Sequence, residues 1–366
     1  MYTYTFDPKA RQLMRFDFRR IPGGAYTSFM KVDDFLSIKW SEPEGPLVEP
    51  PWPSPVIADP SFLFPWESPD GLWELFAHSA FGIHRYSSPD GISWDHRRMV
   101  IGNAMRGFAR PIPAPHNAKN SISRYAIYFE SYPPFALAMT ALPFHGKWKS
   151  RIAMSESINL EDWSKPKTIL VPGQPWAKDS ALGESVSNPC VVEAGDGWRL
   201  YFSASLAWIE DCGFCEPLRL AMAESPTPEG TFAFPDNPLP PPQTQIGNPA
   251  GTTAATLARD LFGEGSIKVL PMEDGFIGLQ NTIYRDPGGK SRSAIFVLRS
   301  ENGIRWEAAQ GKPLAAPGEG WMRSHVYACD CRLDESQGFA YLYFNARDGW
   351  RISQGKERIG RLVGRF

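Results

Sequence analysis

One type of segment occurs four times in this chain and constrains its fold more than any other feature. Each copy is a short apolar strand, followed by a Ser-containing turn with an acidic residue or Gly, and it ends on an aromatic residue. The copies span residues 83–94, 152–163, 220–232 and 296–306. Their closing aromatic residues recur about every 70 residues, and a fixed period of this kind indicates a repeat architecture.

A second piece, in which a strand runs into an aromatic pair or a polar cluster, occurs five times. Its copies span residues 72–79, 125–131, 198–205, 276–281 and 339–347. These strands are short, rich in aromatic and branched residues, and bounded by Gly, Pro, Asn and Asp, which is typical of antiparallel β structure. No long segment has a convincing helical apolar stripe. We therefore predict an all-β fold, a single five-bladed β-propeller over residues 1–366, with four-stranded antiparallel blades around a central channel.

The two ends of the chain also resemble strands. These strand-like segments are residues 1–6 and 358–366. A closed ring requires that its last blade be joined to its first. We expect one terminal strand to complete a sheet built mainly by the other end of the chain.

The charge and the N-terminal sequence limit the partners. The net charge of −2 leaves no basic field for a phosphate backbone, so we expect no nucleic-acid partner. The N-terminus contains no apolar signal-peptide core, and no stretch reaches the length of a membrane span. The sequence therefore predicts a cytoplasmic protein with no membrane partner.

The cysteines allow two interpretations. Five cysteines are an odd number, so structural disulfides are not expected in a chain without an export signal. Cys212, Cys215, Cys329 and Cys331 could together form a four-thiolate zinc site, although the second pair is spaced more tightly than usual. Buried or unused thiols are the simpler interpretation, and we predict no metal there.

The architecture indicates where functional residues should lie. The innermost strand of each propeller blade lines the channel, and its first residues face one mouth. Counting back one hairpin from each copy of the second piece places these strand starts at residues 58–64, 109–112, 187–192, 263–270 and 323–327. Polar residues gather at one end of these otherwise apolar strands.

At these positions the sequence resembles the five-bladed propeller glycoside hydrolases of family 43 and their relatives in families 62, 32 and 68. Asp59, followed by Pro, matches the Asp-Pro motif of blade one, whose Asp is the general base. Glu264, followed by Gly and Ser, is similar to the Glu-Gly-Pro motif of blade four, whose Glu is the general acid. His325 falls where blade five of the family often brings a His near the axis. The resemblance implies that Asp59 is the base and Glu264 the acid.

One position departs from the family. Asn188 stands where blade three carries a second Asp that tunes and positions the acid. Asn can hold geometry through hydrogen bonds but supplies no negative charge to raise a neighbouring pKa. Glu184, four residues earlier, is a candidate for that role. A changed mechanism, a changed substrate and an inactive site are all compatible with the replacement.

Paired carboxyl groups have a physical rationale without the family. Inverting glycoside hydrolysis needs an acid to protonate the leaving oxygen and a carboxylate to activate water, roughly 6.5–9.5 Å apart. Opposite walls of a channel mouth provide such a gap. Arg110 or Arg347 would keep Asp59 ionised, and apolar neighbours would raise the pKa of Glu264. We predict a glycosidase that acts on an oligosaccharide of the arabinose or xylose type.

A sugar site combines aromatic surfaces with polar side chains. The candidate substrate-binding residues are Arg110, His325, Arg347, Trp208, His78 and Glu130. Each also has a structural interpretation: Asp59 as a turn former, Glu264 as a solvated acid, His325 as a structural histidine, and the arginines as partners of acids around the ring.

Two other functions remain open. In a phosphorylase or transferase of a related propeller family, phosphate would replace water, and Arg110, Arg323, Arg347 and His325 would form the anion site. A non-catalytic glycan-binding propeller is consistent with Asn188. No cofactor is expected to be required. The resemblance also implies a possible structural Ca²⁺ near the channel axis, close to His325, although no acidic loop has the spacing of calcium ligands.

Overall fold

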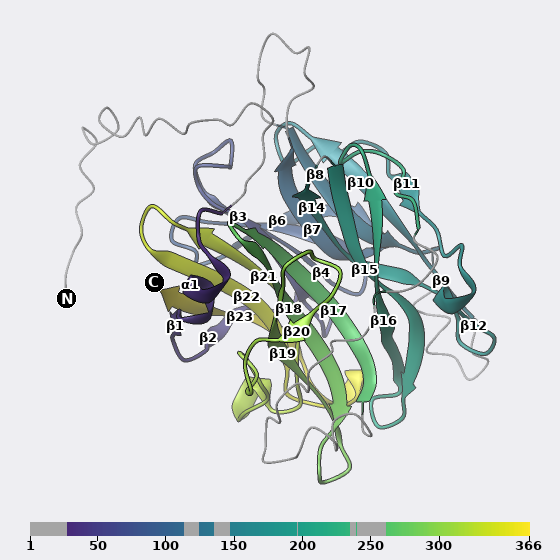
Figure 1. Cartoon of the computed structure of the whole chain (residues 1–366). Helices are drawn as coiled ribbons and strands as arrows, with labels where there is room; N and C mark the ends of the chain where they lie inside the picture. The colour runs from purple at the N-terminus through teal and green to yellow at the C-terminus, as the bar shows by residue number, and fades with distance from the viewer. Residues whose placement is uncertain (1–27, 113–123, 135–146, 196, 235–238, 240–260) are drawn as a thin grey trace.

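The computed structural model describes residues 28–112, 124–134, 147–195, 197–234, 239 and 261–366 (Figure 1). The expected N-terminal strand at residues 1–6 lies outside this range. Strands dominate the described residues. The helical elements are short, namely α1 (Val32–Leu36) and the 3-10 turns Pro175–Ala177, Gly320–Met322 and Ile352–Gln354. None of the described helices combines the length and the apolar character that crossing a bilayer requires.

Within the described residues the strands form five larger antiparallel sheets, and each sheet is named after its innermost strand. The β3 sheet contains β3 (Ala58–Leu63), β4 (Trp73–His78), β5 (Gly82–Ser88) and β6 (Asp95–Gly102). The β7 sheet contains β7 (Ala104–Ile112), β8 (Arg124–Ser131), β10 (Arg151–Ser157) and β11 (Lys167–Leu170). The β14 sheet contains β14 (Val186–Ala194), β15 (Gly197–Ile209) and β16 (Phe214–Ser225).

The two remaining larger sheets come from the C-terminal part of the chain. The β17 sheet contains β17 (Leu261–Met272), β18 (Gly275–Arg285), β19 (Ser291–Ser300) and β20 (Glu307–Ala308). The β21 sheet contains β21 (His325–Asp334), β22 (Phe339–Arg347), β23 (Glu357–Arg365), β1 (Lys39–Trp40) and β2 (Glu44–Val48). A small additional sheet contains β9 (Trp148–Lys149), β12 (Lys178–Asp179) and β13 (Gly183–Glu184).

The predicted four-stranded pattern holds for the β3, β7 and β17 sheets and is modified in the other two. In the β14 sheet, the outer strand is reduced to an isolated bridge between Glu224 and Ala233. In the β21 sheet, both β1 and β2 pair with β23, so that sheet has five strands.

The repeated Ser-containing turns share one set of hydrogen bonds. In three of them, a Ser hydroxyl oxygen accepts from the backbone N–H three residues later, and the Asp or Asn two residues after that Ser accepts from two further N–H groups. The residues are Ser88 with Asp90, Ser157 with Asn159, and Ser300 with Asn302. The repeat predicted from the sequence is therefore a repeat of local turn chemistry, in which side chains satisfy backbone donors.

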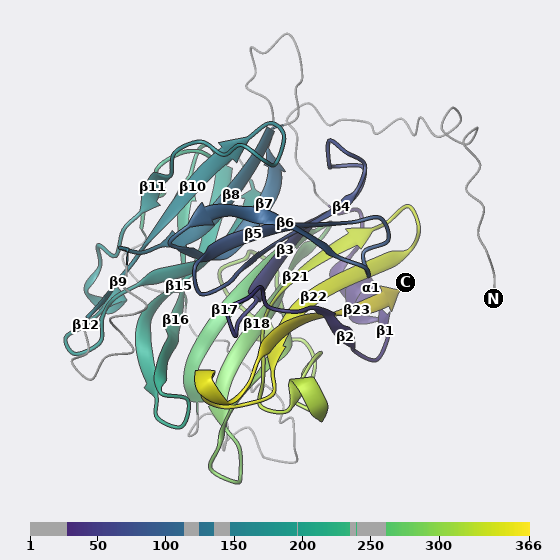
Figure 2. The same ribbon diagram turned by 180° about the vertical axis from the view of Figure 1, so that it is seen from behind.

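The innermost strands contact one another in a cycle. Contacts join β3 to β7, β7 to β14, β14 to β17, β17 to β21, and β21 back to β3. Figure 2 shows β3 lying beside β7, with β21, β22 and β23 next along. The first residues of these strands are thereby brought toward a common axis.

The C-terminal strand β23 connects the two ends of the described chain, and the strands that join it there are β1 and β2. β23 pairs with β22 on one side and with β1 and β2 on the other. The Glu357 N–H donates to the Pro55 carbonyl, and the Ile57 N–H donates to the Glu357 carbonyl, so the last strand is tied to the segment that leads into β3. In Figure 1 the yellow C-terminal strands accordingly lie beside the purple α1 and β1.

Buried tyrosines tie neighbouring sheets together. The Tyr201 hydroxyl of β15 donates to the Gly303 carbonyl in a turn of the β17 sheet, at 3.0 Å. The Tyr343 hydroxyl of β22 donates to the Gly91 carbonyl in a turn of the β3 sheet, at 2.6 Å. Gly91 also accepts from Arg361, at 3.1 Å. Each tyrosine thus satisfies a turn carbonyl of the next sheet.

Because the Gly91 carbonyl accepts from both Tyr343 and Arg361, removing the two tyrosine hydroxyl groups should have unequal effects on stability. Tyr201→Phe should lower the free energy of unfolding by about 1–2 kcal/mol, because the buried Gly303 carbonyl loses its partner. Tyr343→Phe should have a smaller effect, since Arg361 still donates to Gly91. Urea denaturation of the two variants checks the order, and an equal or reversed order would contradict this role of the tyrosines.

Candidate functional site

The same irregularity occurs in all five innermost strands. In each strand the pairing register skips two residues, which is the signature of a β-bulge. The first skipped residues are Asp59, Arg106, Asn188, Glu264 and Tyr327. Asp59, Arg106 and Asn188 have φ angles of 49°, 56° and 50°, a left-handed conformation that non-glycine residues seldom adopt. The bulges therefore redirect side chains at corresponding places in the five sheets. Non-glycine residues held in a left-handed backbone conformation often mark functional sites.

Glu264 lies at the bulge of β17 but in a different local conformation. There the left-handed residue is the following Gly265, with φ of 59°. A side chain at this glycine would clash, because its Cβ would lie 2.2 Å from the Asn281 carbonyl oxygen. The Glu264 carboxylate accepts a hydrogen bond from the Leu220 N–H of β16, at 2.8 Å. Burial raises its pKa, while the Leu220 hydrogen bond and the charge of Arg219 oppose this shift.

Asp59 is held at the start of β3 by its own backbone. Its N–H donates to the Asn345 Oδ1 at 3.0 Å, and its carboxylate lies 3.5 Å from the His78 Nδ1. That Nδ1 accepts from the Arg106 N–H at 3.2 Å. Burial lowers the pKa of His78 to about 4, so the ring is neutral at neutral pH. The contact between Asp59 and His78 is therefore not an ion pair.

Arg106 connects two carboxyl groups. Its Nη1 donates to Glu130 at 2.6 Å, and its Nη2 lies 4.0 Å from Glu216. The Trp148 Nε1 donates to the other oxygen of Glu130 at 3.0 Å. Both oxygens of Glu130, which is fully buried, are thus engaged. Glu130 anchors Arg106, and Arg106 presents its second nitrogen toward Glu216.

Glu216 has the properties of a proton donor. It lies on β16, where the β15–β16 hairpin continues beyond the end of β14. Burial raises its pKa to about 7, and the negative charge of Asp59 adds to this rise. Arg106, a hydrogen bond with Tyr327 and the charge of Arg347 act in the opposite direction. Near neutral pH this carboxyl group is therefore partly protonated, as a general acid must be.

A third carboxyl group, Glu357, begins β23. It accepts a hydrogen bond from the Asn345 Nδ2 and lies 3.9 Å from the Arg347 Nη1. Burial raises its pKa to about 8, with Asp59 and Glu216 contributing and Arg347 opposing. Asn345 thereby joins the Asp59 backbone to Glu357. We call Asp59, His78, Arg106, Glu130, Asn345, Glu216, Tyr327, Arg347 and Glu357 the mouth cluster.

Of the residues predicted from the sequence, Asp59, His78, Glu130 and Arg347 belong to this cluster. His325 is next to it, since it pairs with Arg347 across β21 and β22 and its ring stacks on Tyr327, with ring centres 5.2 Å apart. Its Nε2 lies 3.3 Å from the Ser291 Oγ, and burial lowers its pKa to about 3.

The other predicted residues have different surroundings. Arg110 makes two hydrogen bonds to Asp330, of 2.8 and 2.6 Å, further along the innermost strands. The Asn188 amide donates toward the hydroxyls of Ser187 and Ser203. Glu184 lies in the small sheet, where Lys149 and Lys178 pair with it and lower its pKa. Trp208 is 42% exposed on β15. Their predicted roles in catalysis or substrate binding remain predictions.

Three members of the mouth cluster are absent from the sequence prediction, namely Glu216, Arg106 and Glu357. The repeat pattern points to the starts of the innermost strands, whereas Glu216 lies on the third strand of its sheet and Glu357 on the closing strand. Arg106 lies just before the predicted strand start at residues 109–112. The available signal for Glu216 was a lone acid among Cys215, Pro217 and Leu218 in a strand.

The described residues near His325 are a poor fit for the Ca²⁺ that the resemblance allows. Calcium prefers several oxygen ligands, whereas the Arg347 guanidinium lies beside this ring and would repel a cation. No group of three or more His, Cys, Asp or Glu among the described residues is arranged to hold a metal ion. The four cysteines considered for zinc are not brought together there either: Cys212 packs with Ile209, and Cys329 and Cys331 lie in a separate core cluster.

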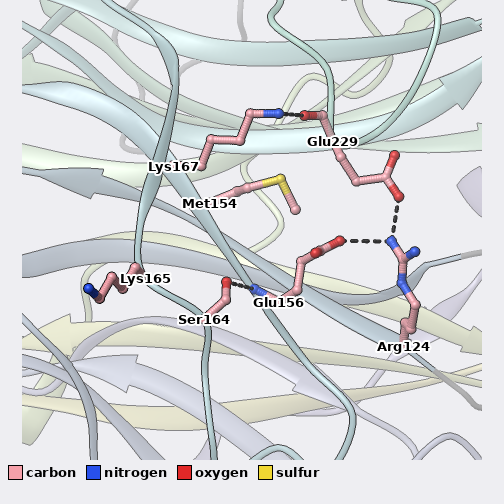
Figure 3. A pocket seen from close by; sticks show the side chains of 7 residues that line it. All are labelled: Arg124, Met154, Glu156, Ser164, Lys165, Lys167 and Glu229. Atoms are coloured by element: carbon pink, nitrogen blue, oxygen red, sulfur yellow. Dashed lines mark hydrogen bonds and ion pairs between the residues drawn. The ribbon is translucent and has the colours of Figure 1, made fainter.

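A surface pocket lies away from the mouth cluster, on the outer strands of the β7 sheet (Figure 3). Arg124 donates to Glu156 and Glu229 there, and the Lys167 Nζ donates to the Glu229 carbonyl. Arg124 and Glu130 stand at opposite ends of β8. The charges that line this pocket pair largely with one another, so we assign it a structural role.

Neither a protein-family profile nor a curated protein sequence matches the chain. Solved structures do. One glycoside hydrolase has a TM-score of 0.61 at 11% identity, with 90% of this chain and 93% of the other covered. A thermostable family-43 glycoside hydrolase has a TM-score of 0.53 at 12% identity, with coverage of 84% and 88%. An N-acetylgalactosamine deacetylase from F. plautii, solved with blood group B trisaccharide, has 0.55 at 14% identity, with coverage of 90% and 96%.

These similarities establish the fold of the chain. It is an all-β protein with several antiparallel four-stranded sheets, and its structural neighbours include propeller glycoside hydrolases. The resemblance predicted from the repeats is confirmed at the level of fold. Since one fold supports different chemistries, including the deacetylase, the activity has to be argued from the mouth cluster.

The raised pKa values of Glu216 and Glu357 predict how stability depends on pH. Above pH 4.5 an unfolded glutamate is ionised, whereas these two stay protonated in the folded chain up to about pH 7 and 8. Folding then takes up protons, so the contribution of these two groups to the free energy of unfolding decreases as pH rises from about 5 to 8. Glu357→Gln should make this pH-dependent decrease in the free energy of unfolding smaller by up to roughly 4 kcal/mol.

Urea denaturation at pH 5, 6.5 and 8 measures this effect, with Glu301→Gln on the exposed surface as the control. The comparison uses the change with pH, so a constant loss of packing in the variant does not affect it. Parallel pH dependence of wild type and Glu357→Gln would contradict the buried, protonated state of this group.

Proposed function

We propose that the chain is a single five-bladed β-propeller that hydrolyses a glycosidic bond in an oligosaccharide, with Asp59 as general base and Glu216 as general acid. The cycle of contacts among the five innermost strands supports the blade count and the single domain. The observation that carries the activity is the Asp59–Glu216 pair: a buried carboxyl group with a pKa of about 7, raised in part by the charge of a second carboxylate. A carboxyl group that can donate a proton, close to a second carboxyl group, is what glycoside hydrolysis requires.

The proposed mechanism assigns one task to each member of the pair. The Asp59 carboxylate removes a proton from the water that attacks the anomeric carbon. Its position is fixed by the Asn345 hydrogen bond to its backbone. Glu216 gives its proton to the leaving glycosidic oxygen. Arg106 then stabilises the Glu216 carboxylate that results. Solvent carries the proton taken up by Asp59 back to Glu216, so both groups return to their starting states.

The stereochemical outcome follows from this division of tasks. If Asp59 activates water directly, the anomeric configuration is inverted in a single displacement.

An arabinose-type or xylose-type substrate remains the proposal from the sequence. The proposed partner is therefore an oligosaccharide, with no role for nucleic acid or membrane, and a cytoplasmic location also stays a prediction.

The assignment of Glu216 replaces Glu264 as the proposed acid. The hydrogen bond between Glu264 and Leu220 directs that carboxylate to β16, and Arg219 is the charged group that acts on its pKa. Glu216, in contrast, is influenced by Asp59, Arg106 and Arg347. The acid assignment thus rests on electrostatic coupling to the base.

Three variants separate these assignments. Asp59→Asn and Glu216→Gln should each reduce kcat by about 10³-fold or more, since each removes a proton-transfer group. Glu264→Gln should keep activity within a few-fold of wild type. Product release is measured on arabino-, xylo-, galacto- and fructo-oligosaccharides, and NMR of the first product gives its anomeric configuration.

Folding of each variant is checked by its thermal unfolding midpoint. Loss of activity in Glu264→Gln with normal activity in Glu216→Gln would restore the assignment made from the sequence. Absence of cleavage by the wild type across the panel would remove the hydrolase proposal and leave the glycan-binding alternative.

A further inference from the structure

Arg347 is a buried cation without sufficient partners. Its side chain is 2% exposed, and among the described residues its Nε and Nη2 have no hydrogen-bond partner. Its Nη1 lies 3.9 Å from Glu357, beyond ordinary hydrogen-bond length. Buried charges and buried N–H groups are normally paired, because an unpaired one loses its hydration without compensation. The two unpartnered nitrogens therefore indicate a ligand.

The neighbouring acid does not neutralise this guanidinium. The pKa of Glu357 is raised to about 8, so this carboxyl group is largely protonated at neutral pH. Glu216 is partly protonated under the same conditions, and Glu130 is engaged by Arg106 and Trp148. Asp59 is the remaining carboxylate of the mouth cluster, and the proposed chemistry occupies it. Arg347 thus keeps a positive charge for another group.

His325 supplies a second unpartnered atom on the same side of the sheet. It pairs directly with Arg347 in register, and directly opposite residues of antiparallel strands place their side chains on one face. Its Nδ1 is buried and, among the described residues, has no hydrogen-bond partner. The Phe214 ring, whose centre is 5.9 Å from the Arg347 Cζ, adds an apolar wall.

We propose that Arg347, with His325 beside it, is the anchor of an oxyanion subsite next to the Asp59–Glu216 pair. This inference rests on the proposed function for the identity of the ligand. A guanidinium binds the two oxygens of a carboxylate or phosphate through parallel N–H donors, and Nε with Nη2 forms such a fork. The oxyanion is either the carboxylate of a uronic acid unit in the substrate or inorganic phosphate that acts in place of water.

Binding measurements test the subsite without requiring turnover. Calorimetric titration of wild type compares glucuronate and galacturonate with glucose and galactose, and a separate titration uses inorganic phosphate. Wild type should bind at least one oxyanion about tenfold or more tightly than the neutral sugars. Arg347→Met should abolish this preference, and Arg347→Lys should weaken it because the fork is lost. Arg305→Met, which removes an exposed guanidinium outside every candidate site, should leave it unchanged.

Activity assays then identify the source of the oxyanion. Cleavage of uronic-acid oligosaccharides in preference to neutral ones, lost in Arg347→Met, would assign the subsite to the substrate. Phosphate-dependent cleavage that releases a sugar phosphate would assign it to phosphate and would replace the proposed hydrolysis with phosphorolysis.

Two results would overturn the subsite: equal binding of charged and neutral sugars and no binding of phosphate by wild type, or undiminished oxyanion binding in a folded Arg347→Met variant. Cleavage of neutral glycosides without oxyanion preference would reject the oxyanion subsite and support the proposed glycosidase activity. Oxyanion binding that depends on Arg347, without any cleavage, would support the subsite and reject the glycosidase activity.

Discussion

The bulge in each innermost strand is the constraint on which the candidate site depends. A regular strand alternates its side chains between the two faces of the sheet, and a bulge interrupts that alternation at one place. Asp59 and Arg106 are redirected in this way from neighbouring sheets. Because the innermost strands contact one another in a cycle, residues far apart in sequence reach the same region.

Burial of several charges in one region gives these residues their chemistry. His78 loses its charge because burial opposes protonation, whereas Glu216 and Glu357 retain their protons because burial opposes ionisation. Arg106 remains charged through its pairing with Glu130. The same arrangement that supplies a base and an acid also leaves Arg347 without a full partner.

The sequence predicts local features well and long-range ones less well. The turns at Ser88, Ser157 and Ser300 were predictable because their hydrogen bonds form within a few residues. Asp59 stood out through its place in the repeat. Glu216 did not, because it reaches the cluster only when the β15–β16 hairpin extends past β14, and this depends on packing of Ile209 and Cys212 against Ile283. Glu264 satisfied a short motif, but the left-handed glycine after it changes the local geometry.

The protonation state of Glu216 decides whether this carboxyl group can serve as an acid coupled to Asp59. Titration of ¹³C-labelled glutamate carboxyl groups by NMR, with Glu216→Gln to assign the resonance, measures it in the absence of any substrate. We expect a midpoint of about 7 that falls in Asp59→Asn, because the neutral amide no longer opposes ionisation. A midpoint near the ordinary value of 4.5, unchanged in Asp59→Asn, would contradict the coupled pair.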